Sequence, residues 1–173
     1  MSQPIETIRL DQLLLNAGLV ASRSRARDAI TRGTVRVNGR VVTKPSSSFP
    51  LSAVIEIDDP AQAYVSRAAL KLKAALEAFG LDPAGLDCLD IGASTGGFTE
   101  ILLERGASHV VAVDVGHDQL HPRLEADDRV TSHEGLNARV LDADHLDDRA
   151  IGAVVSDVSF ISLKLALPPA LTL

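Results

Sequence analysis

The feature that most constrains the fold is an apolar run that passes through a glycine-rich turn into an amphipathic segment. Residues 86–91 (LDCLDI) have the continuous apolar character of a buried strand, residues 92–98 (GASTGGF) form the turn, and residues 99–106 (TEILLERG) continue as a helix. A second apolar run, HVVAVDV, follows shortly afterwards. This order of strand, glycine loop, helix and strand predicts a βαβ unit with a parallel sheet.

The glycine loop also limits the ligand. Its glycines are spaced GxxxGG, whereas the loop that admits a dinucleotide pyrophosphate is spaced GxGxxG. S-adenosylmethionine carries a carboxylate and no phosphate, and backbone N–H groups at a helix start can bind a carboxylate. Asp114 ends the second strand, 22 positions after Gly92, at a suitable distance to accept both ribose hydroxyls of an adenosine. Together these features predict a nucleotide-type site, while the loop alone is equally explained by an ordinary tight turn.

Charge divides the chain into two parts. Residues 9–44 contain eight Arg and Lys against two Asp, whereas residues 61–173 contain nine basic and seventeen acidic residues. The formal net charge of −6 therefore hides a basic N-terminal part. The polar, proline-containing segment 58–63 (DDPAQA) is suited to a junction between the two parts. We expect one domain over residues 1–60 and a second over residues 61–173.

The first domain begins with two predicted helices. Apolar residues within 8–17 follow a helical spacing that ends at Gly18. Ser22 is a suitable N-cap for a second helix, which Gly33 closes. Beyond Gly33 the apolar periodicity changes from helical to alternating, which predicts strands.

The alternating part predicts a β-hairpin. The pair Asn38-Gly39 lies between the runs VRV and RVV, and this pair accepts the positive φ angles of a type I′ turn. Residues 51–57 (LSAVIEI) predict one more strand.

Three arginines occupy the first turns of the second predicted helix. Arg23, Arg25 and Arg27 lie where the helix macrodipole is positive and a cation is mildly unfavourable. A phosphate backbone beside the helix start would contact both the guanidinium groups and the free N–H groups. A solvated basic face explains the charge equally well, so the order of the elements has to decide between the two interpretations.

That order resembles a known RNA-binding module. Residues 9–45, from RLDQLLLNAG to VVTKP, are similar to the module named after the fourth small-subunit ribosomal protein. Such modules bind structured RNA mainly through its shape and phosphates. Aromatic residues form only 3% of the chain, too few to stack on single-stranded bases. The resemblance implies that the positions forming or supporting the RNA-contacting surface are Arg9, Asp11, Ser22, Arg23, Arg27, Gly33, Val37, Asn38 and Lys44.

The second domain carries further motifs. Residues 64–80 (YVSRAALKLKAALEAFG) predict a helix that ends at the glycine. Its apolar face is formed by Ala69, Leu72, Leu76 and Phe79. Residues 153–160 (AVVSDVSF) predict a strand that ends in an acid at the carboxyl edge of the sheet, where open α/β sheets bind ligands. With DIGASTGGF and HEGLNAR, these segments resemble the TlyA family, whose methyltransferase domain is similar to the FtsJ ribose methyltransferases, and the resemblance spans nearly the whole chain.

The resemblance implies a fold, a reaction and a set of residues. The fold is α/β: a small α+β RNA-binding domain of two helices and a hairpin, followed by an incomplete Rossmann-like methyltransferase domain. The reaction is methyl transfer from S-adenosylmethionine to a ribose 2′-hydroxyl of ribosomal RNA. Of the family's Lys-Asp-Lys-Glu catalytic set, Lys71 matches the first lysine and Asp157 the aspartate, while Asn137 and Arg139 fall in a segment near the adenine. The implied cofactor-binding positions are Asp90, Gly92, Ser94, Gly96, Gly97, Phe98, Asp114 and Asn137.

The chemistry of the catalytic pair follows from elementary principles. A ribose hydroxyl is too weak an acid to ionise unaided, so a desolvated lysine would accept or share its proton while an acid orients that lysine. Holding the hydroxyl oxygen in line with the sulfonium methyl group would supply much of the remaining rate. Without the resemblance, Lys71 is a surface helix lysine beside Lys73, Asp157 caps a strand end, and Asn137 makes a turn.

The chain is shorter than such a domain requires. We count four strand candidates from residue 61 onward, and the segment ISLKLALPPALTL leads from Asp157 to Leu173. The segments expected to carry the second lysine and the glutamate are not among them, and Lys164, seven positions past Asp157, is a poor substitute. The sheet would have an uncovered edge, which predicts self-association unless a partner closes it.

Other classes of protein are disfavoured by what the sequence lacks. No apolar run approaches the roughly twenty residues that span a bilayer, and MSQPIETIRL has no signal-peptide pattern, so we expect a cytoplasmic protein without a membrane span. The single cysteine, Cys88, predicts a buried structural thiol, and five scattered histidines predict no metal site. We expect ribosomal RNA or a ribosomal subunit as the partner, and not DNA.

Three other functions stay open. A non-catalytic RNA-binding protein would bind RNA through its arginines without methyl transfer. A hemolysin is suggested by a second label of the TlyA family, although the sequence has neither a membrane span nor a basic amphipathic pore helix. An unrelated nucleotide enzyme is disfavoured by the GxxxGG spacing.

Overall fold

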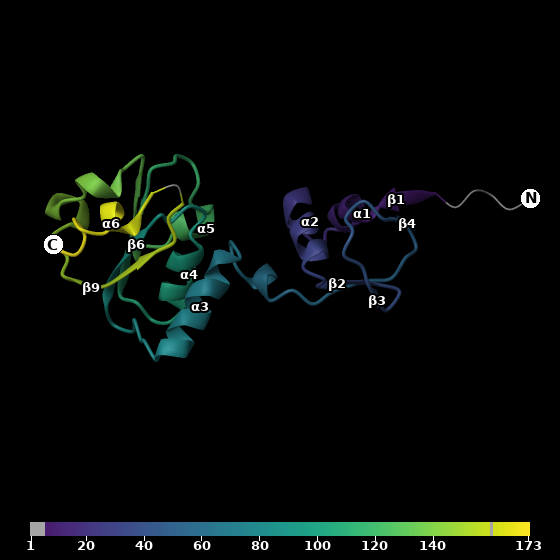
Figure 1. The fold of residues 1–173 in the computed structure, drawn as a ribbon, viewed down its shortest axis with the longest axis horizontal. Coiled ribbons are helices and arrows are strands. Elements are labelled where there is room, and N and C mark those ends of the chain that lie inside the picture. The colour runs from purple at the N-terminus through teal and green to yellow at the C-terminus, as the bar shows by residue number, and fades with distance from the viewer. Residues whose placement is uncertain (1–5, 160) are drawn as a thin grey trace, which may run out of the picture. The chain divides into compact units, whose positions relative to one another are not determined.

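The chain folds into two compact units, Met1–Gln62 and Ala63–Leu173, each with its own hydrophobic core (Figure 1). The computed structural model describes residues 6–159 and 161–173. Residues 1–5, within the segment searched for a signal peptide, and Phe160, the last residue of the AVVSDVSF motif, lie outside the described residues.

Two short helices form part of the N-terminal unit. They are α1 (Leu10–Asn16) and α2 (Arg23–Thr31). Ser22 caps α2 as predicted, because its side chain accepts a hydrogen bond from the Arg25 N–H. The predicted start of the first helix is wrong at Ile8, which lies in strand β1 (Thr7–Arg9) opposite Phe49. Pairing with a distant strand satisfies its backbone groups, a contact that the helical spacing of its side chain did not reveal.

Antiparallel strands complete the N-terminal unit, in a three-stranded sheet of order β3-β2-β5 and a separate pair of β1 with β4. The strands are β2 (Val35–Val37), β3 (Arg40–Val41), β4 (Ser48–Pro50) and β5 (Ile55–Ile57). The predicted hairpin is confirmed, since Asn38 and Gly39 have φ angles of 50° and 76°. The strand predicted over 51–57 is shorter than expected because residues 51–54 leave the extended ladder to make a turn.

The C-terminal unit is built on a four-stranded parallel sheet of order β8-β7-β6-β9. Its strands are β6 (Asp87–Ile91), β7 (His109–Asp114), β8 (Val130–Glu134) and β9 (Ile151–Ser156). The chain runs outward from β6 through β7 to β8 and then returns to the other side of β6. The carboxyl ends of β6 and β9 therefore form a topological switch point, where open α/β sheets bind ligands. The predicted strand, loop, helix and strand order and the four predicted strands are confirmed.

Helices cover this sheet on both faces. On one face lie α3 (Ala68–Phe79) and α4 (Gly97–Glu104), and Figure 1 shows α6 (Leu163–Ala166) on the other side of β6. The remaining helical segments are η1 (Pro60–Ala63), α5 (Pro122–Glu125), η2 (Ala138–Val140) and η3 (Ala143–Leu146). Gly80 ends α3 in the left-handed conformation, as predicted. Phe79 was expected on the apolar face but is 76% exposed, because it occupies the last turn, beyond the edge of the core.

The core of the C-terminal unit places β6 and β7 at its centre. Four of the five residues of β6 and five of the six residues of β7 are buried, whereas β9 is only partly buried. Cys88 is fully buried, and desolvation raises the pKa of its thiol to about 11, so the predicted structural thiol is confirmed. Among the described residues, no helix has the length and apolar character needed to cross a membrane.

Candidate functional site

A cavity of about 590 Å³ lies at the carboxyl ends of β6, β7 and β9, within the size range of small-molecule sites. The start of α3 and the loops after these strands form its wall. The predicted catalytic and cofactor positions that line it are Lys71, Gly92, Ser94, Phe98, Asp114, Asn137 and Asp157. The fold thus brings segments from distant parts of the sequence to one site, at the switch point of the sheet.

The carboxylate of Asp114 is fixed by two backbone donors. The Ser94 N–H donates to Oδ2 and the Gly116 N–H donates to Oδ1, each over 2.8 Å. A carboxylate oxygen can accept more than one hydrogen bond, so both oxygens of Asp114 can accept further bonds. A carboxylate held in this way on the cavity wall can accept hydrogen bonds from two vicinal hydroxyl groups.

The glycine loop uses most of its own N–H groups. Gly92 and Ala93 donate to the carbonyl of Val113 over 2.8 and 3.2 Å, and Gly96 donates to the carbonyl of Ala93 over 2.8 Å. The prediction of a carboxylate bound at the helix start concerns the amides that begin α4 at Gly97, and it stays a prediction. With the N–H of Ser94 already bound, four N–H groups of the loop before α4 are satisfied. The reason is that the loop folds back onto the end of β7, which satisfies its donors.

Asp90 lies behind the cavity wall. Its side chain is fully buried, and Oδ2 accepts a hydrogen bond from the Thr99 hydroxyl of α4 over 2.7 Å. Oδ1 has no hydrogen-bond partner among the described residues. Desolvation raises the pKa of this carboxyl from 3.8 to about 7, and the carboxylates of Asp114 and Asp157 add to the rise. Asp90 therefore joins the sheet to α4, and it is absent from the residues that line the cavity.

Two predicted cofactor glycines allow close packing and do not line the cavity. A methyl group on Gly97 would lie 2.2 Å from Oγ of Ser66 and 2.9 Å from the backbone nitrogen of Ala69, at the start of α3. A methyl group on Gly96 would lie 2.3 Å from Cδ1 of Leu124 in α5. Only glycine lets α4 approach α3 and α5 this closely. Gly96 and Gly97 therefore affect the cavity only through the positions of the helices that pack around it.

Lys71 and Asp157 form an ion pair at the cavity. Lys71 Nζ donates to both carboxylate oxygens, over 2.6 and 2.9 Å. The segment before α3 is held by Glu100, which accepts the Val65 N–H over 2.7 Å and also pairs with Arg123. The Lys71 side chain is 65% exposed, so this chain alone does not supply the desolvation expected for a proton-accepting lysine.

The predicted site residues did not include Gln119, Ser66 and Arg67, which also line the cavity. Ser66 and Arg67 open the motif that contains Lys71, and Gln119 lies in the loop after β7. The available signal was position, because loops that follow parallel strands meet at the carboxyl edge of the sheet. Asn137 lines the cavity while its Oδ1 accepts the Arg139 N–H over 3.1 Å, so it also makes the turn given as its alternative role.

In the N-terminal unit, one buried carboxylate holds three arginines. The Nε atoms of Arg9, Arg23 and Arg27 lie 3.0, 3.0 and 3.1 Å from the carboxylate oxygens of Asp11. Asp11 is fully buried, whereas the arginine side chains are 44%, 43% and 56% exposed. Hydrogen bonds from these arginines hold the pKa of Asp11 well below its usual range. Asp11 is therefore a supporting residue, and the three guanidinium groups form a preorganised basic surface.

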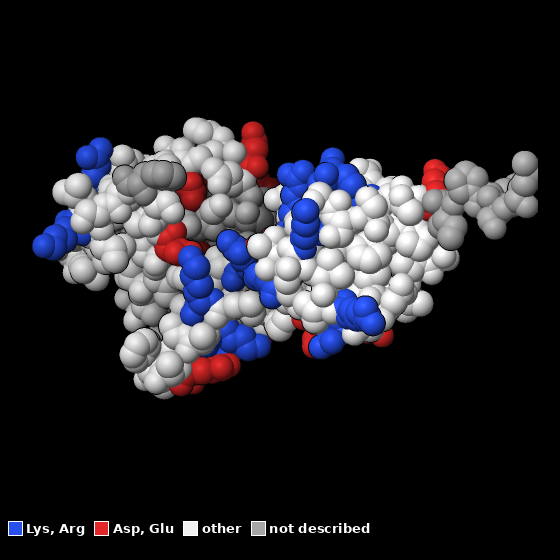
Figure 2. All heavy atoms as spheres, turned by 45° about the vertical axis from the view of Figure 1, so that its right-hand side comes forward, with Lys and Arg blue, Asp and Glu red and all other residues white. Residues whose placement is uncertain are grey.

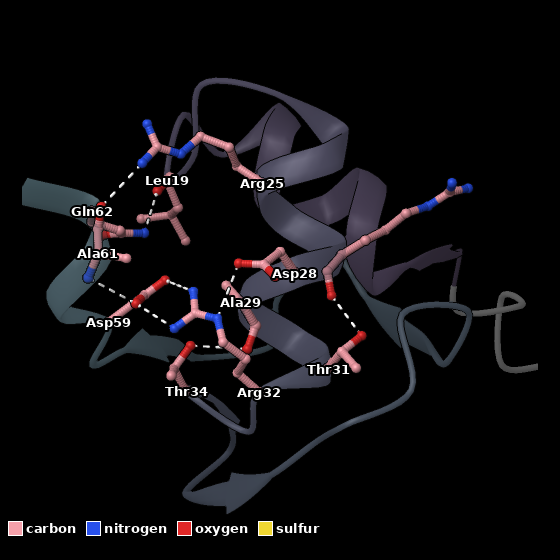
Figure 3. Close-up of polar contacts among 11 residues, drawn as sticks. Leu19, Arg25, Asp28, Ala29, Thr31, Arg32, Thr34, Asp59, Ala61 and Gln62 are labelled. Carbon is pink, nitrogen blue, oxygen red and sulfur yellow. Dashed lines mark hydrogen bonds and ion pairs between the residues drawn. The ribbon is translucent and has the colours of Figure 1, made fainter. Parts of the chain in front are cut away.

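Two other arginines, Arg25 in α2 and Arg32 directly after it, bind the end of the N-terminal unit (Figure 3). Arg32 donates to both carboxylate oxygens of Asp59 over 2.6 and 2.8 Å and also pairs with Asp28. Arg25 donates to the carbonyl of Ala61 over 3.0 Å. These contacts attach the segment after β5 to α2. The basic residues of α2 and its C-cap thus divide into a group that faces Asp11 and a group with a structural role.

The remaining predicted RNA-binding positions differ in exposure. Val37 is buried in the core, so it supports the surface and does not contact a ligand, while Asn38 and Lys44 are exposed. Gly33 has a φ of 75°, which glycine adopts without strain. Figure 2 shows basic side chains in separate groups on the N-terminal unit, with few acidic side chains on the same face.

Two family models match the chain. The S4 domain model matches residues 8–55, and the FtsJ-like methyltransferase model matches residues 64–173, which is more than half of the chain. The chain belongs to the FtsJ-like methyltransferase family. The S4 match confirms the predicted RNA-binding module.

Similar proteins of named function match nearly the whole chain, including both units. The 16S/23S rRNA (cytidine-2′-O)-methyltransferase TlyA of Mycobacterium tuberculosis is 48% identical over 161 residues, which cover 92% of this chain and 60% of that protein. Hemolysin A of Brachyspira hyodysenteriae is 44% identical over 93% of this chain and 67% of that protein. The predicted resemblance to the TlyA family is confirmed, and this chain spans about 60% of the length of the M. tuberculosis relative.

Solved structures show the same fold. A structure from Streptococcus thermophilus, which carries a provisional hemolysin name, matches with a TM-score of 0.66 and 38% identity over 95% of this chain and 61% of that one. A similarly named structure from Lactococcus lactis matches with a TM-score of 0.60 and 47% identity over 62% of this chain and 51% of that one. The predicted α/β fold, an RNA-binding domain before an FtsJ-like methyltransferase domain, is confirmed.

The family matches and the local geometry divide the chain in the same way. Every residue that lines the cavity lies within the FtsJ-like match, residues 64–173. Asp11 and its three arginines lie within the S4 match, residues 8–55. The FtsJ-like family assignment therefore applies to the unit that contains the Lys71–Asp157 pair.

Proposed function

We propose that this chain serves as an S-adenosylmethionine-dependent methyltransferase that methylates a ribose 2′-hydroxyl of ribosomal RNA. Residues 1–60 would bind the RNA, and residues 61–173 would hold the cofactor and present the catalytic pair. The observation that carries this proposal is the Lys71–Asp157 ion pair, which lies on the wall of the same cavity as Asp114.

The residues of the cavity fit the cofactor. Asp114 offers both carboxylate oxygens to vicinal hydroxyls, and Val115 and Leu136 give an apolar wall beside Asn137 that suits a purine. Arg67 adds a cation to the wall, which suits the carboxylate of the amino-acid moiety. When bound, S-adenosylmethionine supplies an electrophilic methyl group attached to a sulfonium. These residues would therefore bind the adenosyl part and leave the methyl group within reach of the catalytic pair.

Lys71 and Asp157 would act on the ribose hydroxyl. Asp157 orients the Lys71 ammonium through two hydrogen bonds, so the lysine has a fixed direction at the cavity. RNA bound over the cavity would exclude water from Lys71 and favour its accepting or sharing the hydroxyl proton. Positioning the oxygen for attack on the methyl group would supply the larger part of the rate.

The identity of the RNA is supported by the relatives. TlyA of M. tuberculosis is named for 16S and 23S rRNA, and the TlyA protein of Campylobacter jejuni, 43% identical over 63% of this chain, is named for 23S rRNA. The arginines around Asp11 suit a structured RNA because they bind phosphates. Action on ribosomal RNA would take place in the cytoplasm.

Cofactor binding tests the proposal first. We expect calorimetry to detect S-adenosylmethionine binding to the 173-residue chain and its loss in the Asp114→Ala variant, while Asp128→Ala, which removes an exposed acid of the same unit, binds as the parent does. Transfer of a labelled methyl group to ribosomal subunits, with release of the labelled nucleotide as a 2′-O-methyl nucleoside, tests the reaction. No cofactor binding by the parent would contradict the proposal.

A second candidate function is RNA binding without methyl transfer. The cluster of Asp11 with three arginines favours it, because this surface is complete without the cavity. Arginine-dependent RNA binding by a parent chain that binds no S-adenosylmethionine would establish this function in place of the first. The hemolysin name belongs to relatives, and leakage of liposomes by the purified chain would be the direct sign of such an activity here.

We also propose that the open edge of β9 associates with another strand. Among the described residues β9 pairs with β6 on one side only, and most of its residues are half-buried. An unpaired edge with apolar side chains favours pairing with a second copy. Light scattering during size-exclusion chromatography should show a dimer or larger species, and a monomer at all concentrations would contradict this.

A further inference from the structure

A loop of the cavity wall has a residue that the proposed function leaves without a role. The loop follows Asp114 and carries Gln119, which lines the cavity. Oε1 of Gln119 accepts a hydrogen bond from Oγ of Ser94 over 3.1 Å. Ser94 is also the residue whose N–H holds Asp114, so Gln119 and Asp114 contact the same loop residue from the same wall.

The amide of Gln119 and the carboxylate of Asp114 both lie close to Gly116. A methyl group on Gly116 would lie 1.6 Å from Nε2 of Gln119 and 3.2 Å from Oδ1 of Asp114. The cavity wall beside Gly116 thus has a hydrogen-bond donor, Nε2 of Gln119, and an acceptor, Oδ1 of Asp114. The hydrogen bonds of the described residues leave Nε2 of Gln119 without an acceptor.

Glu134 holds this loop in place. It ends β8, and its carboxylate accepts the N–H groups of Asp118, Gln119 and Leu120 over 2.5, 2.9 and 3.0 Å. These three bonds keep the pKa of Glu134 below its usual value, so the carboxylate stays ionised. Three consecutive amides bound to one carboxylate fix the backbone that carries the Gln119 side chain.

We propose that Gln119 contacts the cofactor by donating to a ribose hydroxyl oxygen, and that Glu134 is the positioning residue that holds Gln119 beside Asp114. This role rests on the proposed function, since it needs an adenosyl ligand in the cavity. The chemistry is complementary. A ribose diol presents hydrogens that Asp114 accepts and oxygens that require a donor, and Nε2 of Gln119 is a donor beside that acceptor. The pair therefore selects a ligand with ribose hydroxyls over one without them.

Calorimetry with two ligands separates direct contact from support of the loop. We would measure S-adenosylhomocysteine and its 2′,3′-dideoxyribose analogue against the parent and the Gln119→Ala variant. The expected result is a loss of about 3- to 10-fold in affinity for S-adenosylhomocysteine, the value of one hydrogen bond. Affinity for the dideoxy analogue should stay the same, because the contact that the variant removes needs a hydroxyl. Gln119→Glu, which preserves side-chain size but adds a charge beside Asp114, should weaken S-adenosylhomocysteine binding further.

A double variant tests the positioning role of Glu134. Glu134→Gln removes one of the accepting oxygens and should cause the same ligand-dependent loss as Gln119→Ala, and the double variant should bind no more weakly than Gln119→Ala alone. Glu125→Gln, the same change at an exposed position of α5, should bind as the parent does. Additive losses would overturn the role of Glu134.

The outcomes distinguish this inference from the proposed function. If the parent binds S-adenosylhomocysteine and Gln119→Ala weakens both ligands equally, Gln119 only supports the loop. The inference is then overturned while the proposed function stands. If the parent binds neither ligand, the proposed function is overturned and this inference with it.

Discussion

Lys71 Nζ lies 2.6 Å from Oδ2 of Asp157, although the two residues are 86 positions apart in the chain. Lys71 comes from the first turn of α3, and Asp157 directly follows β9. The lysine side chain is 65% exposed and the aspartate side chain 35%. An ion pair so open to water contributes little to folding, about 0 to 1 kcal/mol. The proposed catalytic role, and not folding stability, would explain the place of the pair at the cavity.

Replacing the lysine should separate activity from stability. We expect Lys71→Met to lower methyl transfer to ribosomal RNA by about 100-fold or more, the usual contribution of a general acid or base. The midpoint of thermal unfolding and the affinity for S-adenosylmethionine should stay close to those of the parent. Lys73→Met is a matched control on the same helix, because Lys73 bonds to the Tyr64 hydroxyl and is not among the residues that line the cavity. Equal losses of transfer in both variants would show that Lys71 has no special role.

The sequence predicted the central part of the fold well. The glycine loop, the helix after it and the strand that ends in Asp114 were found because their periodicity and turn residues are local properties. The hairpin at Asn38-Gly39 was found for the same reason. Ile8 was assigned to a helix because its strand partner is about 40 residues away in the sequence. Phe79 was expected to be buried because helical spacing predicts which face of a helix is apolar but not how far along the helix the core extends.

The site was less predictable than the fold. Most N–H groups of the glycine loop are bonded to the end of β7 or within the loop, and only the folded backbone shows which donors are already satisfied. The buried position of Asp11 and the contact of Gly97 with Ser66 depend on packing between segments that the sequence does not pair. Gln119 carries no motif of its own, and its place on the cavity wall comes from the loop that Glu134 holds.

Gly97 should be required for packing. We expect Gly97→Ala to destabilise the C-terminal unit by about 1 to 3 kcal/mol, because the methyl group would meet Ser66 and the Ala69 backbone. Displacement of the start of α3 should also lower the affinity for S-adenosylmethionine. Urea unfolding and calorimetry measure the two effects.

Gly80→Ala is the control for that substitution. Gly80 has a φ of 62° and no neighbour within 4 Å of an added methyl group, so its variant adds backbone strain of about 1 kcal/mol without crowding. Cofactor affinity should then be unchanged. A Gly97→Ala variant that loses no more stability than this and binds normally would contradict the close-packing role.

Asp11 should strengthen RNA binding although it is an acid. We expect Asp11→Asn to weaken binding to a structured ribosomal RNA fragment and to reduce the slope of log affinity against log salt, because three arginines lose their fixed positions. Charge alone predicts the opposite, since the variant is more positive by one unit. The N-terminal unit should also lose about 1 to 3 kcal/mol of stability, as for a buried ion pair whose partners can be rehydrated.

Glu56→Gln is the control for Asp11→Asn, because it shows how the loss of one negative charge by itself changes RNA affinity. Glu56 is an exposed acid on β5 of the same unit, and its removal should leave RNA affinity equal or slightly higher. If Asp11→Asn and Glu56→Gln change affinity in the same direction, Asp11 acts through its charge and does not position the arginines.

Asp90 should make the stability of the C-terminal unit depend on pH. Its pKa is about 7 in the folded chain against 3.8 for an unperturbed carboxyl, so the folded state binds more protons than the unfolded state between these values. The free energy of unfolding must therefore fall as the pH rises from about 4 to about 7. Asp90→Asn cannot ionise, and its carbonyl oxygen can still accept the Thr99 hydroxyl, so it removes the cost of a buried charge. We expect the variant to exceed the parent by about 2 to 4 kcal/mol at pH 8 and by little at pH 4.5. Urea unfolding at both pH values, with Asp128→Asn as an exposed-acid control, measures this, and an advantage of Asp90→Asn that is equal at both pH values would mean that Asp90 ionises normally.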